Sequence, residues 1–204
     1  MGWSSRGQAS GMGLNFNDHY HPLLLKQVPD GARTALDVGC GTGRFARLLA
    51  GRGLEVEGVD AHAEVIEAAG AAGGGPRYRQ ADVREGQLPD GRYDFISCIA
   101  SLHHMPFDTV LTLRKALAPG GVLAVLGLYP VRTAADFAWA LPALCLLRAD
   151  RVLSRHDHAP SVRIPMVWPP PLSYGETRAE SARLLPGSTL RRLLFWRYLL
   201  VYQA

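Results

Sequence analysis

An acidic residue followed by three alternate glycines is the feature of this sequence most clearly suited to chemistry. Residues 35–50 read ALDVGCGTGRFARLLA, in which Asp37 precedes Gly39, Gly41 and Gly43. Glycine-rich turns between a strand and a helix let the backbone approach nucleotides, dinucleotides and other charged cofactors closely. The residues around the turn must therefore indicate which of these ligands it holds.

The residues that flank this glycine loop, residues 39–43, argue against a phosphate ligand. A dinucleotide site requires G-x-G-x-x-G, and Arg44 stands where the third glycine belongs. A P-loop requires lysine and then serine or threonine after its last glycine, but Arg44 and Phe45 follow here. Asp37 precedes the loop, and its negative charge would repel a pyrophosphate. A cationic ligand is favoured instead.

Two further acidic residues are expected at the same edge of the sheet as Asp37. Asp60 ends the second expected strand and Asp82 ends the third, and ligands bind in the crevice outside the carboxyl ends of parallel strands. Asp60 can accept both hydroxyls of a ribose, and Asp82 can accept the amino group of an adenine lying against Val83. Three carboxylates around one nucleoside indicate a ligand without phosphate. S-adenosylmethionine, with its sulfonium, ammonium and ribose diol, fits this description.

Short apolar runs alternate with helix-like windows along the chain, and these elements must position the acids. Strand, helix and strand in repetition predict an α/β fold with a doubly wound, Rossmann-like sheet and right-handed crossovers. The expected strands are residues 34–38, 55–59, 77–81, 93–100 and 121–128. The expected helices are residues 44–52, 63–71 and 108–118, the last ended by the Pro-Gly-Gly sequence at 119–121.

The chain after residue 128 departs from this alternation. Residues 129–174 combine an apolar helix candidate with a proline-rich loop, which predicts an insertion over the sheet. A helix is expected at residues 175–185. The final sequence STLRRLLFWRYLLVYQA carries two β-prone runs with a turn near Phe195 and Trp196. These runs predict an antiparallel pair at the edge of a seven-stranded, mostly parallel sheet.

Length and composition predict a single domain over residues 1–204. The chain is 48% hydrophobic and 20% charged, which is typical of a globular protein that buries a full core. Within it we expect an N-terminal lid segment, a cofactor-binding core, a substrate-side insertion, and a C-terminal helix with the strand pair. These parts correspond to residues 1–31, 32–128, 129–174 and 175–204.

Several classes of protein are disfavoured by composition. No apolar stretch reaches the roughly 20 residues that span a bilayer, and the N-terminus lacks the apolar centre of a secretory signal, so a cytoplasmic location is expected. Three cysteines without C-x-x-C spacing predict neither a disulfide framework nor a thiol-rich zinc site. The net charge is +4, but the arginines are scattered, so no nucleic-acid partner is expected. The oligomeric state is not indicated.

Five sequence blocks, taken together, resemble a known family. They are ALDVGCGTG, VEGVDAHAEVIEAA, YRQADV, YDFISCIASLHHMP and LRKALAPGGVLAVL, and they occur in the family's order and spacing between residues 32 and 128. The sequence resembles the class I S-adenosylmethionine-dependent methyltransferases. Within these it is similar to the ubiquinone and menaquinone biosynthesis group, also called methyltransferase type 11. The resemblance implies an enzyme that uses S-adenosylmethionine as its cofactor.

The resemblance also implies a set of cofactor contacts. The methionine end of the cofactor would be surrounded by the acidic residue and the first part of the glycine loop, the ribose would be held at the end of the second strand, and the adenine at the end of the third. The implied residues, in chain order, are Asp37, Gly39, Cys40, Gly41, Asp60, Ala61, Asp82, Val83 and Ala100. In the N-terminal segment, Tyr20 is expected to stack over the cofactor unless that segment is an ordinary outer helix.

Methyl transfer requires a base only when the nucleophile is a hydroxyl or an acidic carbon. His103 and His104 follow the fourth expected strand, near the place where a methyl acceptor should lie, and His103 is the first candidate for the base. The alternative is that one histidine caps the following helix while the other packs on the cofactor. Paired histidines at 19 and 21, 103 and 104, and 156 and 158 lack neighbouring ligands at recognised spacings, so no metal site is expected.

The acceptor is predicted to be a small molecule. The fourth strand is followed by Ile99-Ala100-Ser101-Leu102 instead of the Asn-Pro-Pro-Tyr type of motif that amino-group methylases of macromolecules carry. Apolar residues of the insertion could either roof a pocket for an apolar or aromatic acceptor or simply pack on the sheet: Phe137, Trp139, Leu141, Leu144, Leu147, Met166 and Trp168. The sequence does not separate O-, C- and N-methylation. A non-catalytic or non-methylating S-adenosylmethionine-binding protein and an NAD-dependent oxidoreductase remain alternatives.

Overall fold

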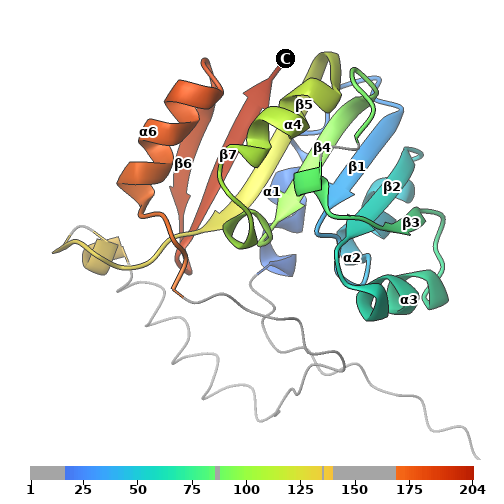
Figure 1. The fold of residues 1–204 in the computed structure, drawn as a ribbon, viewed down its shortest axis with the longest axis horizontal. Helices are drawn as coiled ribbons and strands as arrows, with labels where there is room; N and C mark the ends of the chain where they lie inside the picture. The colour runs from blue at the N-terminus through green and yellow to red at the C-terminus, as the bar shows by residue number, and fades with distance from the viewer. Residues whose placement is uncertain (1–16, 86–87, 135, 140–168) are drawn as a thin grey trace, which may run out of the picture.

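A seven-stranded sheet forms the centre of the protein (Figure 1). The computed structural model describes residues 17–85, 88–134, 136–139 and 169–204. The strands lie in the order β3-β2-β1-β4-β5-β7-β6, and β1 to β5 are parallel while β7 and β6 are antiparallel. Their bounds are β1 (Thr34–Val38), β2 (Glu55–Asp60), β3 (Arg77–Gln80), β4 (Tyr93–Ile99), β5 (Leu117–Leu128), β6 (Thr189–Leu193) and β7 (Arg197–Gln203). The predicted doubly wound sheet with an antiparallel edge pair is confirmed.

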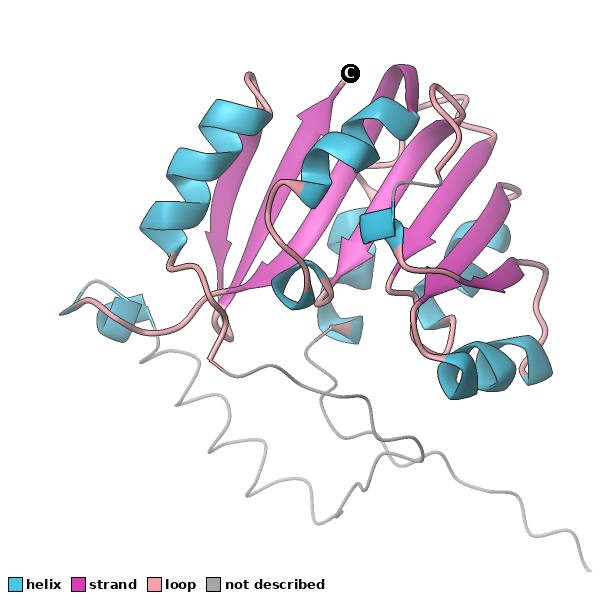
Figure 2. Ribbon diagram, in the orientation of Figure 1, coloured by secondary structure: helices cyan, strands magenta, loops and turns pink. Residues whose placement is uncertain are grey.

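Helices cover both faces of the sheet (Figure 2). Helices α4 and α6 pack on one face, whereas α1 and α2 pack on the other. The helices are α1 (His21–Leu25), α2 (Arg44–Ala50), α3 (Ala63–Ala71), α4 (Thr109–Ala116) and α6 (Tyr174–Leu184), and short 3-10 turns are η1 (Asp18–Tyr20), η2 (Val83–Glu85) and η3 (Leu102–His104). A capping box begins α6, because Ser173 accepts from the Glu176 N–H and Glu176 accepts from the Ser173 N–H.

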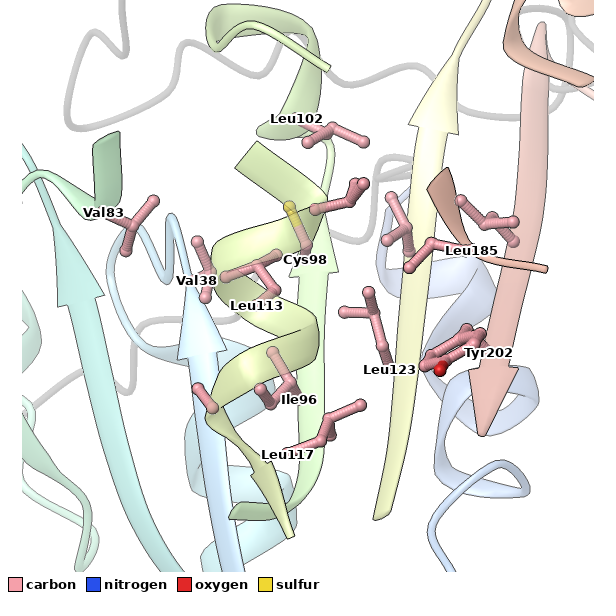
Figure 3. Close-up of a cluster of buried hydrophobic side chains, with 14 of the residues drawn as sticks. Val38, Val83, Ile96, Cys98, Leu102, Leu113, Leu117, Leu123, Leu185 and Tyr202 are labelled. Atoms are coloured by element: carbon pink, nitrogen blue, oxygen red, sulfur yellow. The ribbon is translucent and has the colours of Figure 1, made fainter. Parts of the chain in front are cut away.

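Successive residues of the central strands pack into two separate hydrophobic cores, one on each face of the sheet. Ile96 and Cys98 of β4 face α4, where they pack with Leu113 (Figure 3). Phe95, the residue before Ile96, faces the opposite side and packs with Leu49 of α2. Strands buried on both faces are expected for a parallel sheet between two helical layers. The alternation also decides which face each polar strand residue reaches.

Strand β5 begins earlier than the sequence predicts. The expected helix at 108–118 ends at Ala116, and β5 includes residues 117–120 as well as the expected 121–128. Leu117 pairs with Tyr93, and a register shift follows before Val122 pairs with Phe95. The Pro-Gly-Gly sequence therefore ends the helix as expected but also forms an irregular first part of the strand. Residues that end a helix do not by themselves indicate whether their backbone also belongs to a neighbouring strand.

The predicted hairpin between β6 and β7 is confirmed, and its turn lies at the expected residues. Phe195 and Trp196 both have φ of 57°, in the left-handed region. Because Leu193 pairs with Arg197, the connection has three residues, 194–196, and hairpin loops of this length commonly contain a residue in the left-handed region. Strand β7 lies between β5 and β6, so Arg197 at its start pairs with Leu128 at the end of β5.

One arginine joins the two ends of the insertion to the sheet. Arg192 of β6 forms an ion pair with the buried Asp136 at 2.8 Å. Its guanidinium also lies over the rings of Tyr129, at 5.1 Å, and Tyr174, at 4.2 Å. We call these four residues the Arg192 clamp. They hold both ends of the insertion against the same edge strand.

The predicted apolar roof is only partly within the described structure. Phe137 and Trp139 are 57% and 49% exposed, so their side chains do not pack in the core. The other predicted members of this roof, and the histidines at 156 and 158, lie outside the described residues. Among the described helices, none is long and apolar enough to cross a membrane.

Candidate cofactor and acceptor site

A cavity of about 630 Å³ lies at the carboxyl ends of the parallel strands. Its size is within the usual range for small-molecule sites, roughly 300–1,000 Å³. The structure brings together, in its lining, every predicted site residue except Tyr20: Asp37, Gly39, Cys40, Gly41, Asp60, Ala61, Asp82, Val83, Ala100 and His103. The strand-end rule explains this, since these residues follow β1, β2, β3 and β4.

The glycine loop is folded back onto β2. The N–H groups of Gly39 and Cys40 both donate to the carbonyl oxygen of Val59, at 2.8 and 3.0 Å. Gly39 has φ of 65°, and a Cβ atom on it would overlap the side chain of Ser101. Ser101 in turn donates to the Val38 carbonyl at 2.8 Å. Glycine at position 39 is therefore required for the close approach of the β1 and β4 ends.

Asp37 is a buried carboxyl group whose partner comes from the neighbouring strand. It pairs with Ser97 across β1 and β4, and the Ser97 hydroxyl donates to its Oδ1 at 2.7 Å. Only 2% of Asp37 is exposed. Burial raises the pKa of Asp37 to about 7, against the hydrogen bond from Ser97, and the nearby charge of Asp60 adds to the rise. A cation bound beside Asp37 would stabilise its charged form and lower its pKa.

Asp60 connects the glycine loop to the end of β2. Its Oδ2 accepts from the Gly41 N–H at 3.1 Å, and its Oδ1 accepts from the His62 N–H at 3.0 Å. The Asp60 side chain is 12% exposed and lines the cavity. Both oxygens are thereby fixed in position by the backbone. A carboxylate held in this way can accept two further hydrogen bonds from a diol.

Asp82 and Val83 form a different kind of wall at the end of β3. Both carboxylate oxygens of Asp82 accept from the Arg84 guanidinium, which lowers the pKa of Asp82. An adenine amino group would therefore share this carboxylate with Arg84. Val83 is buried and offers an apolar surface beside it.

Cys40 lines the cavity as a neutral thiol. Burial raises the pKa of Cys40, and the charges of Asp37 and Asp60 raise it further. The group is therefore protonated at neutral pH and contributes packing rather than nucleophilic chemistry.

His103 lies at the opposite side of the cavity from β3, in the turn η3 after β4. Burial, together with the positive charges of His104 and Arg197, lowers the pKa of His103 to about 4. Its ring centroid is 4.1 Å from that of His104. Within the described part of the chain, the buried Nδ1 atom of His103 has no hydrogen-bond partner. The imidazole is neutral at pH 7, so it is able to accept a proton.

The structure does not bring Tyr20 to the other predicted residues. Its ring is buried with Leu24 and Phe45 in the core that α1 and α2 share, and its hydroxyl donates to the Leu194 carbonyl at 3.1 Å. Burial of the apolar ring therefore places it in this core and not in the cavity lining. Other residues of the N-terminal segment do reach the cavity, namely Asn17, Asp18 and His21.

Two arginines that line the cavity, far apart in the sequence, hold this N-terminal segment in place. The sequence analysis did not predict a site role for either of them. Arg44 forms an ion pair with Asp18. Arg197, only 8% exposed, donates to the Asn17 side-chain oxygen from Nε at 3.1 Å and from Nη2 at 2.8 Å. A lone arginine within the apolar run FWRYLLVY was the available signal for Arg197, because arginine is rarely buried without a specific role.

Metal chemistry has no visible basis in the described residues. No group of three or more histidine, cysteine, aspartate or glutamate side chains is placed there to hold an ion.

Comparisons with known proteins agree with the chemistry of this cavity. Residues 36–125 match the family model described as a methyltransferase domain. An uncharacterized methyltransferase of Mycobacterium tuberculosis is 36% identical over 196 residues, covering 93% of this chain and 96% of the relative. A ubiquinone biosynthesis O-methyltransferase of Acinetobacter baylyi is 31% identical over 119 residues, covering 50% of this chain and 48% of the relative.

A solved structure shows the same fold with a related ligand. The complex of DhpI with S-adenosylhomocysteine, the demethylated form of the cofactor, has a TM-score of 0.61 and 24% sequence identity. It covers 91% of this chain and 84% of the DhpI chain. The resemblance inferred from the five sequence blocks is thus confirmed, and the oxidoreductase alternative is not. The chain belongs to the methyltransferase family and uses S-adenosylmethionine as its cofactor.

Proposed function

We propose that this enzyme transfers the methyl group of S-adenosylmethionine to a small, apolar or aromatic molecule by in-line displacement. The observation that carries the proposal is the division of one cavity into an acidic end and an end with a half-buried, neutral histidine. The first suits a cationic nucleoside without phosphate, and the second suits a neutral acceptor. An acceptor that is not a macromolecule is supported by the relative whose name specifies ubiquinone biosynthesis.

The acidic residues would hold the cofactor in three places. Asp60, fixed by Gly41 and His62, would accept the ribose hydroxyls. Asp37 would face the cationic methionine end, where a positive charge compensates the burial of its carboxylate. Asp82 and Val83 would flank the adenine, with Ala61 and Ala100 completing the walls.

The residues at the other end would position the acceptor. When bound, S-adenosylmethionine supplies an electrophilic methyl group on a good leaving group. The protein then mainly aligns the nucleophile and excludes water, and alignment can contribute about 7–11 kcal/mol in favourable cases. His103, neutral at pH 7, would accept the proton of a hydroxyl or an acidic carbon as the new bond forms.

Calorimetric titration of the full chain tests the cofactor part of this proposal. S-adenosylhomocysteine is the ligand and NAD is the control. Saturable binding of S-adenosylhomocysteine alone is expected, since the carboxylates at the strand ends disfavour pyrophosphate. Binding of NAD alone would contradict the proposal. Binding of S-adenosylhomocysteine without turnover of any apolar acceptor would instead favour a protein that binds the cofactor without methylating.

A further inference from the structure

A second cavity, of about 610 Å³, lies beside the first. Its walls are the turn from η3 into α4 on one side and helix α6 with the preceding loop on the other. Figure 1 shows α4 and α6 on the same face of the sheet. Most of the lining is apolar and includes Phe107, Leu172 and Ala179. The cavity therefore has the composition of a site for an apolar molecule.

The two cavities share one wall. His103, Met105 and Leu128 line both. Met105 and Leu128 are apolar, so His103 is the one polar side chain that the two linings have in common among the described residues. The second cavity therefore adjoins the cofactor cavity at these three residues. A methyl acceptor in the second cavity would have its reactive end beside them.

The charged groups around the second cavity are mostly neutralised by one another. Glu180 forms an ion pair with Arg183 at 2.6 Å, and Glu176 forms one with Arg132 at 3.2 Å. Asp108, the remaining charged residue of the lining, is exposed and precedes α4. These groups lie on the more exposed parts of the walls. They do not change the apolar character of the interior near Tyr198, which is buried.

The shared wall also indicates which end group the acceptor carries. The Nδ1 atom of His103 is buried, and no described residue is a hydrogen-bond partner for it. His103 is still the polar group of the shared wall, and a neutral imidazole can form a hydrogen bond with a hydroxyl through the part of the ring that lines the cavities. A cationic amine would meet the positive charge of Arg197, which lines the first cavity together with His103. A hydroxyl is therefore preferred over an ammonium group.

We propose that the second cavity holds the body of the methyl acceptor, and that the acceptor is an apolar or aromatic molecule with a hydroxyl group presented to His103. This inference rests on the proposed function, and it deepens that function by assigning O-methylation and a site between α4 and α6. The exposed Phe137 and Trp139 are not needed to form this site. Helix α6 thereby becomes a determinant of substrate specificity.

A matched pair of tryptophan variants tests the location. Ala179 and Ala182 are both exposed alanines on α6, but only Ala179 lines the second cavity. The probe is 2-naphthol, titrated into the full chain saturated with S-adenosylhomocysteine. Ala179→Trp should fill the cavity and weaken 2-naphthol binding at least tenfold, whereas Ala182→Trp should leave it unchanged. Both variants should bind S-adenosylhomocysteine as the wild type does. Equal naphthol affinity in the two variants contradicts the proposal.

A measurement on the unmodified chain avoids any effect of tryptophan on folding. With alanine methyl groups labelled, nuclear Overhauser contacts from 2-naphthol should reach the Ala179 methyl and not the Ala182 methyl. Absence of contact to Ala179, or absence of naphthol binding, contradicts the inference. S-adenosylhomocysteine binding without these contacts removes this inference alone. The contacts without S-adenosylhomocysteine binding would instead remove the proposed function.

The preference of the second cavity for a hydroxyl group is tested by comparing the affinities of three naphthalene derivatives. Wild-type protein should bind 2-naphthol at least tenfold more tightly than naphthalene or 1-naphthylmethylammonium, and His103→Leu should remove the preference over naphthalene. An equal affinity of the wild type for 2-naphthol and the ammonium compound overturns the assignment of the end group.

Discussion

The acidic end and the histidine end of the first cavity are built in different ways. Asp37, Asp60 and Asp82 stand at the ends of three neighbouring parallel strands, so their proximity follows from the repeating strand-helix pattern. His103 meets Arg197 only because β7 inserts antiparallel beside β5, near the end of the chain. The first arrangement depends on local elements in a regular order. The second depends on tertiary contacts between distant segments.

The electrostatics of the two ends also differ. The acidic end holds buried and half-buried carboxyl groups, and the pKa of Asp37 rises to about 7. The other end keeps His103 neutral by burial and by the neighbouring positive charges. A cavity of this kind separates the recognition of a positive ligand from the recognition of a neutral one. Changes at one end should therefore leave binding at the other end intact.

The largest expected effect is on turnover, at the histidine end. His103→Ala should lower the rate by about 10²- to 10⁴-fold, the usual contribution of a general base, while S-adenosylhomocysteine affinity changes little. The rate of S-adenosylhomocysteine release with 2-naphthol as acceptor measures the first, and calorimetry measures the second. His104→Ala is the matched control and should have the smaller effect on turnover. Equal rates in the wild type and His103→Ala would exclude His103 as the base.

The next effect belongs to the acidic end. Asp60→Ala should weaken S-adenosylhomocysteine binding by about 10- to 100-fold, because hydrogen bonds to a charged group contribute about 1.5–3 kcal/mol. Glu64→Ala removes an exposed acid of the first turn of α3 and serves as the control. Calorimetry and a thermal unfolding curve should show lost affinity with an intact fold. Unchanged affinity would remove the ribose assignment of Asp60.

The pH dependence of binding tests the role of Asp37. In the free protein its pKa of about 7 means that the carboxyl is largely protonated below pH 7. The cationic methionine end of a bound ligand favours the charged form of Asp37, so binding below pH 7 releases a proton. The affinity for S-adenosylhomocysteine should therefore rise about tenfold between pH 6 and 8. Asp37→Asn should flatten this profile. A profile that stays equally steep in the variant would assign the titration to another group.

The same pKa shift fixes the sign of one contribution to stability. The pKa of Asp37 is higher in the folded than in the unfolded chain, so its contribution is fully present below about pH 4 and is lost as the pH rises through 7. Asp37→Asn should therefore flatten the fall of the unfolding free energy between these pH values. Chemical denaturation at a series of pH values measures this.

The smallest expected effect concerns the wall of the second cavity. Ser173→Ala removes half of the capping box of α6 and should lower the free energy of unfolding by about 1 kcal/mol. Affinity for S-adenosylhomocysteine should not change, because Ser173 does not line the first cavity. Denaturant titration and calorimetry give the two values. A loss of cofactor affinity in this variant would show that helix α6 is coupled to the cofactor cavity.

The acidic end of the first cavity could be predicted from the sequence, whereas the contacts at its histidine end could not. Strand-end positions placed Asp37, Asp60 and Asp82 in one cavity, because a parallel sheet fixes where each strand ends. The bounds of β1 and α3 also agree with the prediction. Tyr20 and Arg197 were not predictable in this way. Whether a ring packs into a core or over a ligand depends on which distant residues meet it, and no local pattern contains that information.

The Arg192 clamp has a consequence for how this protein can change. Arg132 adds to it by donating to the Pro171 carbonyl at 3.2 Å, so the described residues on either side of positions 140–168 are held at adjacent points. Segments joined at adjacent points can be exchanged as cassettes, since each doubling of loop length costs only about 0.6 kcal/mol in closure entropy. The two flanks of positions 140–168 are therefore joined to the sheet by contacts of their own, which do not depend on the length of chain between them.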